Sequence, residues 1–330
     1  MMKLHEDKKL FHQAVQITSE QINIPAIFVE KDYWITFVLH TIFHNKIGEE
    51  TVFKGGTALS KCFGAIERFS EDIDLVVFRR EGESNNQLTK KIKQISEVVN
   101  SVLPEVEIAN MTQKKGMNRK TAHTYAKEFN GDYGQIRDVI IVEATWLGCS
   151  EPYTIKKVSS LIYEMMIKTG QDLLVEEYNL QPFEVKVLDL NRTFCEKIMS
   201  LVKFSYGKEP IEDLKMKIRH TYDLHQLLKE KELANFFDSP DFDTMMLKVA
   251  NDDVVSYRNN NDWLVFHPNK AIIFAELETI WEELKTAYNS DFRKLVFGDF
   301  PNDSEVLATM KRIKERLKTI EWTIKIENKG

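Results

Sequence analysis

A diglycine between a short apolar segment and a helix, followed by a strand with two acids, constrains this 330-residue chain more than any other feature. The segment TVFKGG predicts a β-strand that ends in a glycine turn, TALSKCFGAI predicts a helix, and DIDLVVF predicts a second strand. Alternate side chains of a strand share one face, so we expect Asp72 and Asp74 to project together while Ile73 points into the core. The order strand, turn, helix and acidic strand therefore predicts a compact unit built on one face of a sheet.

The acid pair has the chemistry of a magnesium site. Magnesium prefers hard oxygen ligands and is usually bound by one or two carboxylates together with substrate phosphates and waters. Gly55 and Gly56, at the start of a helix, offer backbone N–H groups and the positive end of the helix dipole to the same phosphates. We expect the hydroxyls of Thr57 and Ser60 to add hydrogen-bond donors. The two acids are therefore predicted metal ligands beside a phosphate-binding turn.

The two motifs gain specificity only from their combination. An Asp-x-Asp pair also caps turns, and Gly-Gly after a strand is usually just a tight turn. The segment GGTALSK lacks the GxxxxGK[ST] spacing of a P-loop, and the sequence contains no GxGxxG. P-loop and dinucleotide-binding folds are therefore not supported.

The rest of the pattern predicts a mixed first part and a mostly helical second part. Further strands are expected at 106–108 and 125–129, in RDVIIVEATWL and in FEVKVLDL. Helices are expected in AIFVEKDYWITFVLHTIF and over residues 86–103, 212–230, 271–288 and 304–320. We therefore predict an α+β fold with one domain over residues 1–190 and a helical domain over residues 191–330.

Composition is that of an ordinary globular protein, with 43% hydrophobic residues to form a core. The net charge of -6 argues against a constitutive nucleic-acid coat protein, although local lysine and arginine clusters leave a basic face open. The opening MMKLHEDKKLFHQ lacks the apolar core of a secretory signal, and no segment approaches the roughly 20 apolar residues that span a bilayer. Because Cys62, Cys149 and Cys195 form no CxxC pair, we expect reduced thiols in a cytoplasmic protein without a membrane anchor.

Three segments, VEKDYWITFVL, FKGGTALSK and IERFSEDIDL, closely resemble the AbiEii/AbiGii family of nucleotidyltransferase toxins, members of the DNA polymerase β-like superfamily. Later in the chain, TFCEKIMSL and RHTYDLHQLL resemble two further motifs of that family, so the similarity runs from about Val29 to Leu228. The spacing between the diglycine and the acid pair is longer than in the broad superfamily but suits this branch. The resemblance implies a polymerase β-like nucleotidyltransferase core, a mixed sheet with flanking helices, plus a mostly helical C-terminal domain.

The resemblance also implies that the diglycine holds a triphosphate, that the acid pair binds metal, and that Lys197 and Asp223 complete the site. A lysine would offset phosphate charge during transfer, while Asp223 would orient the lysine, assist a metal or accept a proton from the acceptor. The residues by themselves leave simpler alternatives open. In these, Lys197 pairs with Glu196 or Asp223 at the surface, and Asp223 pairs with Arg219 one helical turn earlier.

Glu143 is the candidate for the third carboxylate that the superfamily usually places on a neighbouring strand. An acid inside the apolar segment IIVEATW costs free energy unless it faces a metal or a partner. The alternative is a salt bridge to a residue such as Arg137 or Lys186. Arg68 is expected to anchor its loop or to bind a phosphate, and Lys54 has the same two possible roles.

The expected reaction is metal-dependent transfer of a nucleoside monophosphate from a nucleoside triphosphate to an acceptor hydroxyl, with Mg²⁺ or Mn²⁺ on the acid pair. The resemblance implies a growth-inhibiting toxin of a toxin–antitoxin or abortive-infection system for phage defence, neutralised by a separately encoded antitoxin. Some relatives extend tRNA 3′ ends, so tRNA is the expected acceptor, while a protein acceptor stays open. The alternatives are a nucleotide-binding regulatory module without turnover and an assembly protein acting through its helices; the retained acids, glycines and Lys197 favour the enzyme.

Overall fold

The computed structural model describes residues 1–114, 116–131, 136–148, 150–257 and 260–326. The chain divides into two compact units. The first comprises residues 1–64 and 69–188, and the second comprises residues 65–68 and 189–330. Residues 65–68 of the second unit therefore interrupt the first unit shortly before its acidic strand.

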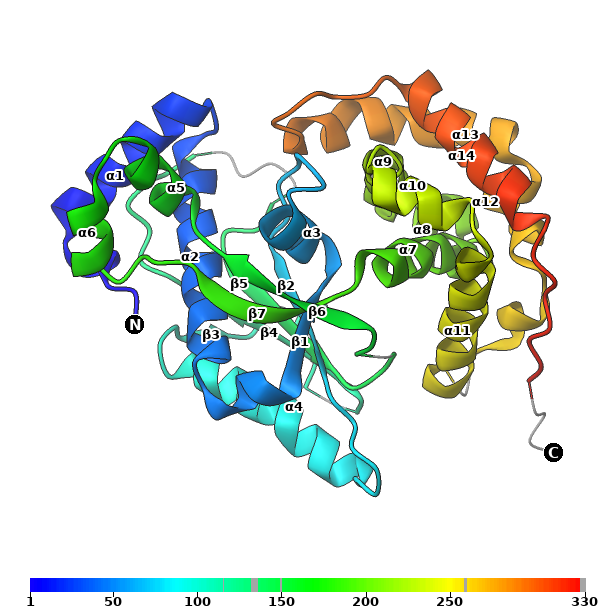
Figure 1. The fold of residues 1–330 in the computed structure, drawn as a ribbon, viewed down its shortest axis with the longest axis horizontal. Coiled ribbons are helices and arrows are strands. Elements are labelled where there is room, and N and C mark those ends of the chain that lie inside the picture. Colours follow the sequence, from blue (N-terminus) through cyan, green and yellow to red (C-terminus); the bar gives the residue numbers. More distant parts are fainter. Residues whose placement is uncertain (115, 132–135, 149, 258–259, 327–330) are drawn as a thin grey trace. The chain divides into compact units, whose positions relative to one another are not determined.

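A seven-stranded mixed sheet forms the centre of the first unit (Figure 1). Its strands are β1 Thr51–Lys54, β2 Asp72–Val77, β3 Glu105–Val106, β4 Asn118–His123, β5 Ile140–Thr145, β6 Tyr153–Val158 and β7 Phe183–Leu188. They lie in the order β3-β4-β5-β2-β1-β7-β6. β2 is parallel to β5 and β1 is parallel to β7, whereas the other neighbouring pairs are antiparallel. This mixed sheet, together with the helices of both units, confirms the predicted α+β class.

Apolar residues hold both faces of the sheet. On β2 the side chain of Ile73 is fully buried, as the alternation of the acidic strand predicts. On the other face of the sheet, Val52 is the cross-strand neighbour of Val76, and Ala122 is the cross-strand neighbour of Ile141. Each pair belongs to a buried apolar cluster. Because both pairs share the face of the two acids, apolar side chains flank the acidic strand on that face.

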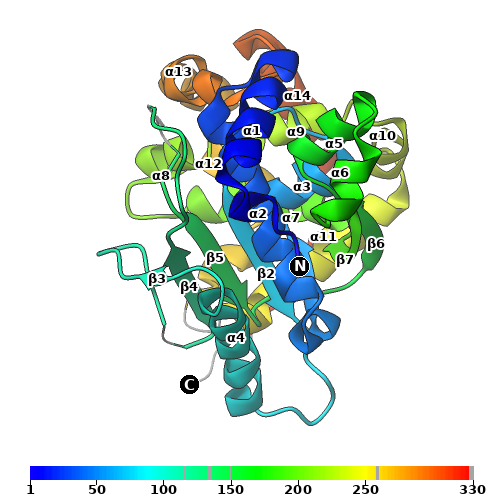
Figure 2. The ribbon, with the colours of Figure 1, turned by 90° about the vertical axis from the view of Figure 1, so that its left-hand side faces the viewer.

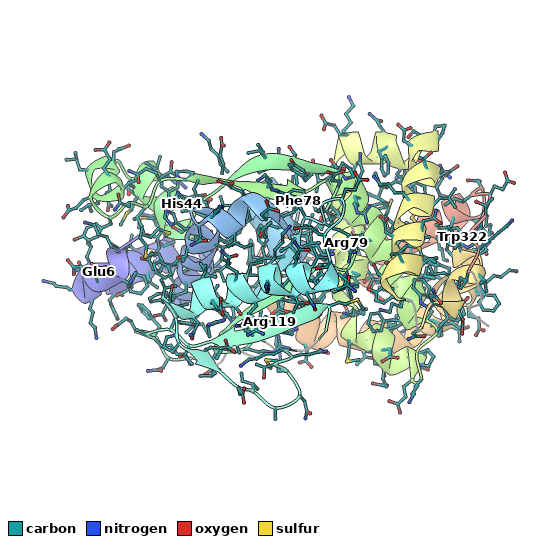
Figure 3. All side chains as sticks on the ribbon, turned by 90° about the horizontal axis from the view of Figure 1, so that it is seen from below. Glu6, His44, Phe78, Arg79, Arg119 and Trp322 are labelled. Carbon is teal, nitrogen blue, oxygen red and sulfur yellow. The ribbon has the colours of Figure 1, made fainter. Side chains whose placement is uncertain are left out.

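Among the described residues of this unit, six α-helices accompany the sheet. They are α1 Lys8–Ile22, α2 Ala26–Phe43, α3 Gly55–Phe63, α4 Asn85–Asn100, α5 Leu161–Lys168 and α6 Asp172–Glu177. α2 and α4 pack against strands of the sheet, and α4 lies beside β4 in Figure 2. Arg119 of β4, labelled in Figure 3, donates from Nε to Ser96 Oγ of α4 at 2.6 Å. Since neighbouring strand residues face opposite ways, Lys120 lies on the face away from α4.

The second unit is mostly helical. Its helices are α7 Leu190–Phe204, α8 Pro210–Met216, α9 Arg219–Leu227, α10 Lys231–Phe237, α11 Pro240–Ser256, α12 Ile272–Ala275, α13 Leu277–Ala287 and α14 Asp303–Leu317. α7 packs against α9 and α11, and α14 packs against α9 and α13. Large buried rings such as Trp281 and Phe242 fill the interior. Within the described residues, no helix combines the length and the apolar character needed to cross a membrane.

Some predicted boundaries are wrong. Residues 125–129 form no strand, because the N–H groups of Glu128 and Phe129 donate to the Glu30 carboxylate instead of a neighbouring strand. The helix after the diglycine ends at Phe63, where Gly64 takes a left-handed conformation with φ 60°. The helices predicted over 212–230 and 271–288 are each divided in two, into α8 and α9 and into α12 and α13.

The cysteines are in accord with reduced thiols where they are described. Cys62 is half-buried and Cys195 is buried, and both are free. Burial raises the pKa of both thiols, which keeps them protonated at neutral pH. Cys149 lies outside the described residues.

Candidate active site

A row of charged side chains crosses the sheet through the acidic strand. Lys54 of β1 lies opposite Asp74 of β2, which in turn lies opposite Glu143 of β5. Glu143 lies opposite Lys120 of β4. Directly opposed residues of neighbouring strands share a face, and Asp72 shares it because it precedes Asp74 by two positions. The structure therefore brings three carboxylates and two lysines onto one face.

The diglycine lies against this row. Gly55 has a φ of +82°, and a Cβ at this position would lie 2.1 Å from Asp74 Oδ2. Only glycine fits such a close approach in a left-handed conformation. Gly55 is also the first residue of α3, so the Asp74 carboxylate lies at the end of the helix where backbone N–H groups lack helical partners. Gly56 follows as the second residue of the same turn.

The hydroxyl of Thr57 forms a hydrogen bond with the protein backbone. Thr57 Oγ1 donates to the carbonyl oxygen of Asp72 at 2.6 Å and lies 3.0 Å from Ser70 Oγ. A hydroxyl has a single hydrogen to donate, and the Thr57 side chain is buried. This contact corrects the expectation that Thr57 donates to phosphate: it holds the start of β2 against α3. Ser60, half-buried one turn after Gly56, remains a candidate donor.

The carboxylate row carries uncompensated negative charge. Burial, together with the nearby charges of Asp72 and Glu143, raises the pKa of Asp74 to about 7 against the opposing effects of Lys54 and Lys120. An acid with its pKa near neutrality is one whose ionised form lacks sufficient stabilising partners. A cation bound at this position would supply the missing compensation.

The acid pair fits a divalent metal ion. Asp72 Oδ1 is buried and has no hydrogen-bond partner within the described part of the chain; Arg137 Nη1 lies 3.6 Å away. Carboxylate oxygens are the hard ligands that Mg²⁺ and Mn²⁺ prefer. Among the described residues, no group of three or more His, Cys, Asp or Glu side chains is arranged to hold a metal. A metal on Asp72 and Asp74 would therefore need phosphate oxygens and waters as further ligands, which is usual for magnesium.

Glu143 is paired with neighbours on β4. It accepts hydrogen bonds from Asn118 Nδ2 at 2.8 Å and from Lys120 Nζ at 3.1 Å. Burial by itself raises the pKa of Glu143, but the lysine charge and the two hydrogen bonds lower it below its ordinary value. The predicted alternative of a salt bridge is confirmed, but its partner is Lys120; Arg137 and Lys186 bond to other groups. Glu143 is thus an ionised neighbour of the acid pair.

In the second unit, a buried carboxylate is held between two cations. Asp223 accepts from Arg68 Nε at 2.7 Å, from Arg68 Nη2 at 2.8 Å and from Lys197 Nζ at 2.6 Å. All three side chains are buried. Burial by itself raises the pKa of Asp223, yet the charges of Arg68 and Lys197 hold it well below its usual range. Of the predicted alternatives, the pairing of Lys197 with Asp223 is confirmed, although both side chains are buried and not at the surface.

Arg68 was predicted either to anchor its loop or to bind a phosphate, and its contacts favour the first role. Its bidentate pair with Asp223, a β-bridge to Val296 and the bond from the Glu67 N–H to the Tyr222 hydroxyl hold residues 65–68 within the second unit. The guanidinium is buried and committed to a carboxylate. This geometry fits the anchor and corrects the expectation of a phosphate ligand.

Sequence reasoning missed a second group of charges next to the acid pair. Lys31 Nζ donates to Glu71 Oε2 at 2.5 Å, and Arg137 Nη1 donates to Glu71 Oε1 at 3.1 Å. Glu71 immediately precedes Asp72. The available signal was the run Glu30, Lys31 and Asp32 inside an apolar helix, since charges buried in a core must be paired.

The fold and this site together define a class: an α+β protein with a pair of carboxylates beside the start of a helix, as expected of a nucleotidyltransferase. A family model described as "Nucleotidyl transferase AbiEii toxin, Type IV TA system" matches residues 37–316. The chain therefore belongs to the AbiEii family of nucleotidyltransferase toxins, and it is a nucleotidyltransferase.

A solved structure is also similar to the chain. It is MenT4, a nucleotidyltransferase toxin from Mycobacterium tuberculosis, with a TM-score of 0.47 and 16% sequence identity. The similarity covers 92% of this chain and 96% of that one. No curated protein matches the chain.

Proposed function

We propose that this protein transfers a nucleoside monophosphate from a nucleoside triphosphate to the 3′ end of a tRNA, in a reaction that depends on Mg²⁺ or Mn²⁺. The observation that carries the proposal is the contact between Asp74 Oδ2 and Gly55 at the start of α3, with Asp72 on the same face. This contact supports the proposal because it puts the proposed metal ligands next to the N–H groups that are proposed to bind phosphate.

In this mechanism the N–H groups of Gly55 and Gly56 bind the triphosphate. Asp72 and Asp74 would hold the metal ion, which would supply Lewis-acid activation of the acceptor hydroxyl and charge neutralisation at the leaving pyrophosphate. Lys54, beside Asp74 in the same row, adds positive charge for the phosphates. In-line attack on the α-phosphorus then requires no covalent enzyme intermediate.

Glu143 is proposed as the third carboxylate of the site, kept ionised by its partners on β4. The family resemblance assigns Lys197 and Asp223 to the same reaction. The Lys197 ammonium would offset the phosphate charge that builds during transfer. Because its pKa is held so low between two cations, Asp223 suits the orientation of Lys197 rather than acceptance of a proton.

As a member of its family, the protein is proposed to inhibit growth as the toxin of a type IV toxin–antitoxin or abortive-infection system that acts against phage. Its antitoxin is a separate protein. The reaction takes place in the cytoplasm, where nucleoside triphosphates and tRNA are available. A tRNA acceptor is proposed because some members of the family extend tRNA 3′ ends, and nucleotidylation of a protein is the alternative.

Incubation with each α-labelled nucleoside triphosphate, magnesium, and either total RNA or total protein tests the proposal. Label in tRNA supports it, and label in protein would replace the tRNA acceptor by a nucleotidylated protein. Binding without any label would indicate a regulatory nucleotide-binding module. The double variant Asp72→Asn, Asp74→Asn is the control: it keeps the shape of both side chains and should give no label.

A further inference from the structure

Arg137 is held at three points beside the acid pair. Its backbone N–H donates to Glu71 Oε2 at 2.7 Å, and its carbonyl oxygen accepts from Lys31 Nζ. Its guanidinium Nη1 donates to Glu71 Oε1 at 3.1 Å. The side chains of Lys31 and Glu71 are 0% and 3% exposed, so this clamp is built from a buried ion pair.

A buried ion pair is costly, because both charges lose their hydration and well-packed apolar residues often serve stability equally well. Here both members of the pair bond to the same residue of the segment before β5. Lys31 also neutralises Glu71 at 2.5 Å, so the carboxylate does not need the guanidinium charge for its own compensation. The pair therefore fixes Arg137 while leaving the positive charge of Arg137 available to its surroundings.

The guanidinium lies where a nucleotide phosphate is expected. Nη1 is 3.6 Å from Asp72 Oδ1, and the side chain is 36% exposed. Within the described residues, the polar contacts of the guanidinium all use Nη1, so Nε and Nη2 can donate to a ligand. A planar guanidinium fork matches the oxygens of a phosphate group in bidentate fashion.

We propose that Arg137 binds the β- or γ-phosphate of the nucleoside triphosphate, and that Lys31 and Glu71 are positioning residues that hold it there. This inference rests on the proposed function, because it requires a triphosphate on the face of Asp72 and Asp74. It adds to that function a phosphate ligand from outside the diglycine and the acidic strand.

Binding of inorganic tripolyphosphate with magnesium, measured by calorimetry, tests the inference without turnover, since this probe carries no nucleoside to transfer. Arg137→Ala should weaken binding about 10- to 100-fold, the usual loss for a hydrogen-bonded charged pair. Arg137→Lys keeps the positive charge but lacks the planar guanidinium that binds two oxygens, so it should lose less tripolyphosphate affinity than Arg137→Ala. With labelled nucleoside triphosphate, Arg137→Ala should raise KM more than it lowers kcat. Arg80→Ala is the matched control: it removes an exposed arginine that pairs with Glu50, and it should bind like the unaltered protein.

Unaltered tripolyphosphate affinity in both Arg137 variants would overturn the inference and leave the proposed function standing. Failure of the unaltered protein to bind tripolyphosphate or any nucleoside triphosphate would overturn both. Thermal unfolding of each variant checks the fold. Should Arg137→Ala not fold, the loss expected in Arg137→Lys decides the question, because its ammonium keeps a cation next to Glu71.

Discussion

The two units treat buried charge in opposite ways. In the first, three carboxylates share a sheet face, and burial together with the charges of Asp72 and Glu143 raises the pKa of Asp74 to about 7. In the second, a single carboxylate, Asp223, lies between Arg68 and Lys197, and its pKa falls well below the usual range. The first arrangement favours an added cation, whereas the second is already paired.

The difference indicates whether a buried cluster of charges stabilises the fold or favours the binding of a ligand. Buried charge pairs stabilise the fold only when their hydrogen bonds offset the free energy lost with hydration, as the three close hydrogen bonds to Asp223 do. Like charges held together, as Asp72 and Asp74 are, oppose the fold. Their position next to Gly55 is therefore better explained by a ligand than by stability.

The largest expected effect is on transfer. Asp74→Asn removes a carboxylate that is proposed to bind the metal ion, and without the metal the phosphate charge is not offset during transfer. Labelling of the acceptor should therefore fall by about 10³-fold or more. The same variant should unfold at a higher temperature, since repulsion with Asp72 and Glu143 is relieved. Labelling and thermal unfolding are measured on one preparation. A variant that is both inactive and less stable would show that Asp74 supports the fold.

The second prediction is that loss of a carboxylate charge destabilises the second unit, the opposite of the effect expected for Asp74→Asn. Asp223→Asn leaves Arg68 and Lys197 buried without a carboxylate, which should lower the free energy of unfolding by about 3 to 5 kcal/mol. Chemical denaturation measures the loss. A stability equal to that of the unaltered protein would remove the contrast between the two clusters.

A third prediction concerns the contact between the diglycine and the acids. Gly55→Ala introduces a Cβ 2.1 Å from Asp74 Oδ2 and should cost about 1 to 3 kcal/mol of stability together with most of the nucleotide affinity. Gly82→Ala is the matched control, because Gly82 has a similar φ of +79° but nothing within 4 Å of the added Cβ. Equal behaviour of the two variants in nucleotide titrations would mean that backbone strain alone accounts for the effect.

The smallest predicted effect is a pH dependence in the second unit. Burial lowers the pKa of His220 well below its ordinary 6.5, and the charges of Lys197 and Lys217 lower it further. The unfolded chain therefore binds a proton that the folded protein does not, so stability should fall as the pH drops below about 6.5. The slope is about 1.4 kcal/mol per pH unit for one proton. His220→Gln should reduce this slope between pH 6.5 and 5 in denaturation experiments; an unchanged slope would assign the dependence to other groups.

Much of the candidate site was predictable from short segments. The period of two in β2 placed Asp72 and Asp74 on one face, and the diglycine marked the start of α3. The α+β class followed from the same local patterns. The strand predicted at 125–129 failed because a distant carboxylate, Glu30, takes its N–H groups, which no local pattern reveals.

The sequence by itself determined which residues alternate along a strand and where a helix begins, because these depend on the backbone of adjacent residues. Only the tertiary structure decided the charge partners: Arg68 meets Asp223 across 155 positions, and Lys31 meets Arg137 across 106. Coulombic attraction depends on distance in space and on burial, and both arise only after the chain has folded.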